Sequence, residues 1–158
     1  MSYVLTGYIV PDSIENARRT RDRLGLVLDV VSIGSDCTIF ANRNRQEFGL
    51  NDTAVRELLK QYGRLLTVLW DDRSGLRASI VHGASGEQLR FGADEELYAE
   101  LDDQGFPLLN GKVYSLKDVE TSIDDKEFET CKNAVELGCE ASGFCQPNEV
   151  MEFIRYNK

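Results

Sequence analysis

The chain has 158 residues, of which 42% are hydrophobic and 28% are charged, a composition that is typical of globular proteins and excludes a disordered one. The length suits one core, so we expect residues 1–158 to form a single domain. A net charge of −9 disfavours nucleic acids and membranes as partners, because both repel acidic proteins. The sequence has neither the apolar run of a membrane helix nor the basic start of a secretory signal, and we therefore expect a cytoplasmic protein.

The first half of the sequence alternates between strand and helix patterns. Asp12 and Glu15 have capping-box spacing, and Gly25 marks the end of the helix that they open. Turn residues separate the segments that follow. The predicted elements are a strand over 3–10, a helix over 12–24, strands over 26–33 and 37–42, a helix over 52–62, and strands over 64–70, 76–82 and 88–91.

The predicted helix over 52–62 has the clearest periodicity in the chain. Its apolar residues stand at i, i+3, i+4 and i+7: Val55, Leu58, Leu59 and Tyr62. This spacing places them on one face, which we expect to pack on the sheet. Asn51, Asp52 or Thr53 can cap the helix.

After this helix the sequence predicts a meander of strands. The dipeptide Asn110-Gly111 indicates a hairpin between strands over 106–109 and 112–114. Together these patterns predict an α+β fold: a split β-α-β-β-α-β start, extended by a β-meander, in a mainly antiparallel sheet with helices packed on it.

Helices are also predicted in the second half. One covers 94–103, and a longer one opens at Asp124 or Asp125, with Val135 and Cys139 on its apolar stripe. Residues 147–156 fit either a short helix or a strand.

Charge is divided unevenly along the chain. Residues 1–90 carry 12 Lys and Arg against 11 Asp and Glu, a net of +1, whereas residues 91–158 carry 6 against 16, a net of −10. We interpret the acidic part as a surface that attracts a basic protein partner. The candidate partner-binding residues are Asp94, Glu95, Glu96, Glu100, Asp102, Asp103, Asp118, Glu120, Asp124 and Asp125.

Two other interpretations of the acidic clusters are a solvated face that maintains solubility and a calcium site. The second is disfavoured because no stretch shows the alternating acidic loop of an EF-hand.

Cysteine spacing argues against a metal. Cys131, Cys139 and Cys145 are seven and five residues apart, not in the paired arrangement of zinc ligands. We expect all four cysteines, including Cys37, to be reduced, with no metal and no cofactor. Cys131 and Cys139 lie on the apolar stripe of the long helix, where we expect them to fill the core.

The sequence shows no catalytic constellation. His82 is the only histidine, and strand alternation places it beside Ala78 and Ile80 on an inward face. No nucleophile elbow, phosphate-binding loop or zinc-protease motif occurs. The arginines of the helix over 12–24 are interpreted as a solvated face. We therefore expect a protein without catalytic residues that is not an enzyme.

The second half resembles bacterial immunity proteins of polymorphic-toxin and contact-dependent systems, especially the group paired with deaminase toxins. The resemblance rests on the hairpin over 106–114, the Ser115-Leu116-Lys117-Asp118 stretch, a long helix over 125–141, and Gly143 and Pro147 before a final apolar segment over 150–153. It implies a small cytoplasmic protein that binds and blocks one cognate basic toxin domain, one that acts on nucleic acid. The alternative function is a small-molecule-binding or regulatory α+β domain.

Overall fold

The structure is a computed structural model that describes residues 4–34, 36–47, 49–72, 76–84, 88–94, 96–97, 108–109, 112–113 and 133–156. Its strands are β1 (Val4–Val10), β2 (Asp29–Ile33), β3 (Cys37–Asn42), β4 (Arg64–Asp71), β5 (Leu76–Gly83), β6 (Gln88–Asp94), β7 (Glu96–Leu97), β8 (Leu108–Leu109) and β9 (Lys112–Val113). Its helices are α1 (Ile14–Leu24), the 3-10 turn η1 (Arg45–Glu47), α2 (Asp52–Tyr62), α4 (Asn133–Ser142) and α5 (Pro147–Tyr156).

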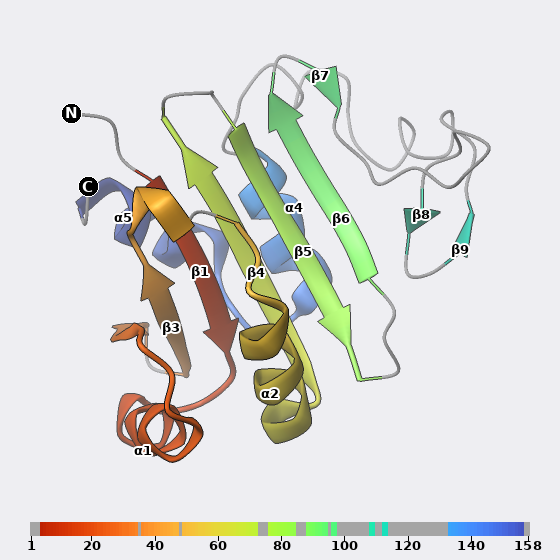
Figure 1. The fold of residues 1–158 in the computed structure, drawn as a ribbon. Coiled ribbons are helices and arrows are strands. Elements are labelled where there is room, and N and C mark those ends of the chain that lie inside the picture. The colour runs from red at the N-terminus through yellow and green to blue at the C-terminus, as the bar shows by residue number, and fades with distance from the viewer. Residues whose placement is uncertain are drawn as a thin grey trace.

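The strands form one antiparallel sheet in the order β2-β3-β1-β4-β5-β6-β8-β9, with β7 paired to β6 (Figure 1). β3 lies between β1 and β2, and β1 lies between β3 and β4, as the split β-α-β pattern requires. At the centre, Tyr8 of β1 is opposite both Phe40 and Thr67. β4, β5 and β6 then continue as a meander. The predicted α+β fold is therefore confirmed.

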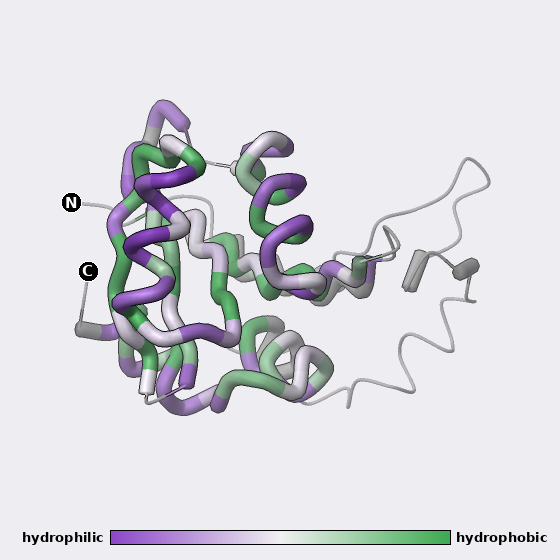
Figure 2. The backbone as a smooth tube through the Cα atoms, turned by 90° about the horizontal axis from the view of Figure 1, so that it is seen from below, coloured by the Kyte–Doolittle hydropathy of each residue, from purple (hydrophilic) through white to green (hydrophobic). Residues whose placement is uncertain are grey.

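Helices cover both faces of this sheet. α1 and α2 lie on one face, and α4 and α5 lie on the other (Figure 1). All seven residues of β1 are buried, because a central strand between two helix layers has no solvent-facing side. In Figure 2 hydrophilic and hydrophobic residues alternate along the helices, as the two faces of an amphipathic helix require.

Each face of the sheet has its own core. Residues of β1 alternate between the two, so that Tyr8 and Val10 face α1 and α2 while Leu5 and Ile9 face α4 and α5. The predicted stripe of α2 is confirmed: Leu58 is fully buried, and the other three residues are partly buried against the same core.

Local capping explains where α1 and α2 begin and end. The Ser13 side chain accepts a hydrogen bond from Asn16 N–H, so α1 begins at Ile14, two residues later than predicted. Asn51 caps α2 in the same way through Ala54 N–H. Gly25 and Gly63 follow the two helices with φ of 68° and 76°, a left-handed conformation that glycine adopts without strain.

The predicted strand over 26–33 is wrong in its first three residues, since β2 begins only at Asp29. The end of α1 explains this difference. Gly25 N–H donates to Asp22 O and Leu26 N–H donates to Arg21 O, which is the double hydrogen bond of a Schellman cap. Leu26 therefore belongs to the helix terminus, and residues 26–28 form a connection.

The predicted helix over 94–103 is also wrong where the structure describes it. Asp94 ends β6, and Glu96–Leu97 forms β7, which turns back and pairs with β6 through Asp94 opposite Glu96. Hydrogen bonds to the edge of β6 favour the extended backbone over a weak helical pattern. Residues 98–103 lie outside the described residues.

The remaining predictions for the second half have mixed outcomes. The hairpin is confirmed, because Leu108–Leu109 pairs with Lys112–Val113 across Asn110-Gly111. The ambiguous tail is helix α5, which begins at Pro147. The predicted long helix is described only from Asn133 onward, as α4. In the described part of the chain, no helix is long and apolar enough to cross a membrane.

Candidate functional site

The predicted partner-binding residues lie almost wholly outside the described part of the chain. Asp94 is the last residue of β6 and Glu96 is the first of β7, directly opposite each other in the sheet. The other eight fall in segments that the structure does not describe: Glu95, Glu100, Asp102, Asp103, Asp118, Glu120, Asp124 and Asp125.

The uneven charge of the sequence is nevertheless visible in the described helices. α1 carries four arginines against two acidic residues, and α2 carries two basic residues against two acidic ones, which gives this layer a net charge of +2. α4 carries two glutamates and no basic residue, and α5 carries two glutamates and one arginine, a net charge of −3. The two helix layers, on opposite faces of the sheet, therefore differ in the sign of their charge.

Exposed side chains carry much of this difference. Arg18, Arg19 and Arg23 are exposed on α1, whereas Glu140 on α4 and Glu152 on α5 are exposed on the opposite side of the sheet. Charges on solvent-exposed side chains contribute to the long-range field that guides a charged partner.

Three cysteines meet in the core beneath α4 and α5. Cys37 of β3, Cys139 of α4 and Cys145, just before α5, are all buried and free. The Cys37 thiol donates to Phe144 O, and Cys145 Sγ lies 3.6 Å from Ser142 Oγ. Burial raises the pKa of Cys37 to about 12, and a hydrogen bond with Cys145 together with burial raises the pKa of Cys139 further.

The Cys37 and Cys139 thiols are therefore protonated at neutral pH, and a protonated buried thiol is a poor nucleophile and a poor metal ligand. The hydrogen bond with Cys139 instead lowers the pKa of Cys145. Within the described ranges, no group of three His, Cys, Asp or Glu residues is arranged to hold a metal ion. Cys131 lies outside those ranges. The prediction that Cys139 fills the core is confirmed, and Cys145 is buried in the same core.

His82 is buried in the sheet, as the strand pattern predicted. It stands opposite Leu65 on the face that carries α2, and its Nε2 lies 3.1 Å from Thr67 Oγ1. A hydrogen-bonded histidine inside a sheet has a structural explanation and requires no catalytic one.

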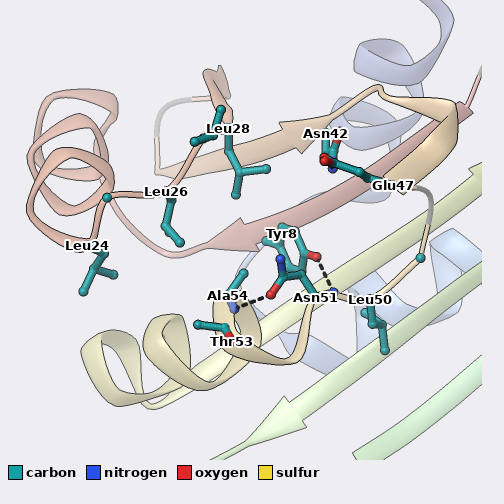
Figure 3. Close-up of a pocket in the computed structure, with 13 residues that line it drawn as sticks. Tyr8, Leu24, Leu26, Leu28, Asn42, Glu47, Leu50, Asn51, Thr53 and Ala54 are labelled. Atoms are coloured by element: carbon teal, nitrogen blue, oxygen red, sulfur yellow. Dashed lines mark hydrogen bonds between the residues drawn. The ribbon is translucent and has the colours of Figure 1, made fainter.

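The described residues also form a pocket that the sequence did not reveal. It has a volume of about 700 Å³ and lies between the connection that follows α1 and the start of α2 (Figure 3). Partly buried leucines from both sides line its wall: Leu24, Leu26, Leu28 and Leu50. This volume is within the range of small-molecule sites, about 300–1,000 Å³.

Polar groups lie at two places in the pocket. Tyr8 rises from β1, and its hydroxyl oxygen accepts a hydrogen bond from Asn51 N–H at 3.0 Å (Figure 3). Elsewhere in the lining, the Asn42 amide donates to the Glu47 carboxylate at 3.4 Å and accepts from Asn44 N–H at 2.9 Å. The arrangement is an apolar wall with a few fixed polar groups, which is typical of ligand sites.

Sequence reasoning missed the pocket because its lining comes from four separate segments. The sequence pattern predicts Tyr8 only as part of a strand and places residues 26–28 in the following strand. One local signal was present: an apolar stretch directly after Gly25 has leucines on both sides of the highly exposed Val27. A helix-ending glycine followed by apolar residues indicates a connection as readily as a strand.

Comparison with known proteins gives no relative: no protein-family model, no curated protein and no solved structure matches this chain.

Proposed function

We propose that this chain is an immunity protein that binds and blocks a basic toxin domain acting on nucleic acid, using its acidic second half. The observation that carries the proposal is the net charge of −10 over residues 91–158 beside +1 over residues 1–90. The resemblance of the second half to immunity proteins points to the same function.

The proposed inhibition depends on carboxylates that imitate the negative charge of the toxin's nucleic-acid substrate. An enzyme that acts on nucleic acid holds phosphates with lysine and arginine side chains. An inhibitor that presents carboxylates to that surface competes with the phosphates, and its field accelerates the encounter.

The described helices support a one-sided arrangement of this charge. Glu140 and Glu152 are exposed on the layer formed by α4 and α5, and this layer follows the acidic segment in the chain. The arginines of α1 lie on the other face of the sheet. We expect a basic partner to approach from the acidic side, away from α1.

The test begins with the partner that co-purifies with the chain from its native cell at moderate salt. Association is then followed by stopped-flow for the wild type and for a variant with Glu95→Gln, Glu96→Gln, Glu100→Gln, Asp102→Asn and Asp103→Asn. We expect the variant to associate at least about tenfold more slowly at low salt, the lower end of electrostatic steering. Dissociation should change less, because exposed charges act mainly on the encounter.

Salt and a matched variant serve as controls. Raising the salt concentration from about 0.05 to 0.5 M shortens the Debye length from roughly 14 to 4 Å, so the wild-type rate should fall toward that of the variant. Arg18→Gln with Arg19→Gln, on the opposite helix layer, should not slow association. Equal rates for all three proteins at every salt concentration would leave the acidic surface as a solubility feature and refute the proposal.

A further inference from the structure

The pocket beside α2 contains a hydrogen-bond donor that is not used within the described residues. Tyr8 is only 1% exposed, and its oxygen accepts the Asn51 N–H bond. Its own O–H hydrogen meets no acceptor among the residues that the structure describes. Burying an unpaired donor costs free energy, so an acceptor is expected at this position.

The Tyr8 hydroxyl remains a donor over the physiological pH range. Burial raises the pKa of Tyr8, and the nearby Asp52 carboxylate contributes to the increase. A protonated phenol can donate to a carbonyl oxygen.

The charges around the pocket select against an anion. Glu47 contributes a carboxylate to the lining, and Asp52 is close enough to act on Tyr8. Two basic groups, Arg21 and Arg43, line a neighbouring depression of about 560 Å³ together with Asp22 and Asp29. A carboxylate ligand would meet more negative than positive charge in the main pocket, whereas an uncharged ligand avoids this repulsion.

We propose that this pocket binds a small, uncharged, mainly aliphatic molecule that carries a carbonyl group. The aliphatic part contacts the leucine wall, and the carbonyl oxygen accepts the hydrogen bond from Tyr8. The site is separate from the proposed function: it lies between α1 and α2, whereas the proposed toxin-binding charge lies in the second half of the chain. Either proposal can therefore fail alone.

The experiment uses the full chain labelled with ¹⁵N and two matched probes, hexanamide and hexanoate. Both have the same aliphatic tail, but only hexanoate is charged. We expect hexanamide to shift the amide signals of Gly49, Asn51 and Ala54, with affinity in the millimolar range that suits so small a ligand. Hexanoate should bind more weakly.

Two variants test the roles of the polar and apolar groups. Tyr8→Phe keeps the ring and removes the donor, so hexanamide affinity should fall about threefold to tenfold, the loss expected for one neutral hydrogen bond. Leu26→Asn removes part of the apolar wall and should also weaken binding. Tyr62→Phe is the matched control, because the Tyr62 hydroxyl already donates to Asp12 at 2.8 Å and lies outside the pocket; it should leave the affinity unchanged.

Each result of these binding experiments either supports or overturns the proposed ligand site. Shifts that are confined to the pocket and weakened by Tyr8→Phe but not by Tyr62→Phe support the site. The absence of shifts, tighter binding of hexanoate, or equal effects of the two tyrosine variants would overturn it. None of these outcomes changes the association rates that test the immunity function.

Discussion

The two faces of the sheet are covered by helices of similar length but different character. On the face of α1 and α2, polar side chains reach into the packing: Tyr8 accepts from Asn51 N–H, Thr6 accepts from Gly49 N–H, and Tyr62 donates to Asp12. On the face of α4 and α5, the buried side chains that the structure describes are apolar apart from thiols and the hydroxyls of Ser79 and Ser142. Both arrangements bury the central strands.

The difference has consequences for what each layer can do. Polar anchoring holds α1 and α2 on the sheet and leaves a pocket of about 700 Å³ between their connections. The layer of α4 and α5 packs so closely that Gly138 of α4 leaves no space for a side chain against β4 and β5. One layer therefore leaves a cavity of small-molecule size, whereas the other packs closely on the sheet and carries a net negative charge.

The largest expected effect compares the two cores directly. Leu58 of α2 and Ile154 of α5 are both essentially fully buried, at 0% and 1% exposure. Leu58→Ala and Ile154→Ala should each lower the free energy of unfolding by about 2–5 kcal/mol, because each leaves a cavity in a packed core. Urea denaturation measures both losses.

A loss below about 0.5 kcal/mol for Ile154→Ala, the range of surface substitutions, would show that α5 is not integral to the fold. The comparison between the layers would then fail, because α4 and α5 would not form a second core. The same small loss for Leu58→Ala would contradict the packing of α2.

A second variant tests the close approach of α4. A Cβ atom at Gly138 would lie 2.2 Å from Ser79 Oγ and 3.1 Å from Leu66 Cδ1. Gly138→Ala should therefore destabilise the protein by about 1–3 kcal/mol through overpacking, although alanine normally stabilises a helix by up to about 1 kcal/mol relative to glycine. Whether Gly138→Ala lowers or raises the free energy of unfolding therefore decides whether α4 approaches the sheet this closely.

Thermal or urea unfolding gives this sign, with Glu140→Ala as the control on the same helix. Glu140 is exposed, and its replacement should change stability by no more than about 0.5 kcal/mol. An increase in stability for Gly138→Ala would mean that α4 packs less tightly against the sheet than the structure indicates.

The two layers also differ in how far the sequence predicted them. α1 and α2 have local signals at both ends, including the Asn51 cap and the glycines that follow each helix, so their bounds were predicted within two residues. α5 was ambiguous because Val150, Glu152 and Ile154 alternate as in a strand. Packing selects the helix, in which Val150 and Ile154 lie one turn apart and both face the core.

Two features of the structure were not predicted, for different physical reasons. β7 pairs with β6 through residues only two to four positions apart, and this tight turn was missed because residues 94–103 have a helical pattern. The pocket joins Tyr8 with residues more than 30 positions away, such as Asn51. The charge division was visible in the sequence, but the placement of oppositely charged helices on opposite faces depends on topology.

The smallest expected effect concerns the polar anchoring of α2. The Tyr62 hydroxyl donates to Asp12 Oδ2 at 2.8 Å and lies 3.2 Å from Thr20 Oγ1. Tyr62→Phe should cost about 0.5–1.5 kcal/mol at neutral pH, the contribution of one hydrogen bond. Asp12 keeps its hydrogen bonds from Ser13 and Asn16, so no buried carboxylate is left without a partner.

The same variant should alter the pH dependence of stability. Burial raises the pKa of Tyr62 to about 12 from its ordinary value of 10, so the folded protein holds this proton more tightly than the unfolded chain does. The resulting stability is fully present below pH 10 and is lost as the pH rises from about 10 to 12. Tyr62→Phe removes this contribution, and the free energy of unfolding should then fall less steeply over that interval. Parallel curves for the two proteins would show that Tyr62 ionises with equal ease in both states, and that the hydrogen bond to Asp12 does not anchor α2.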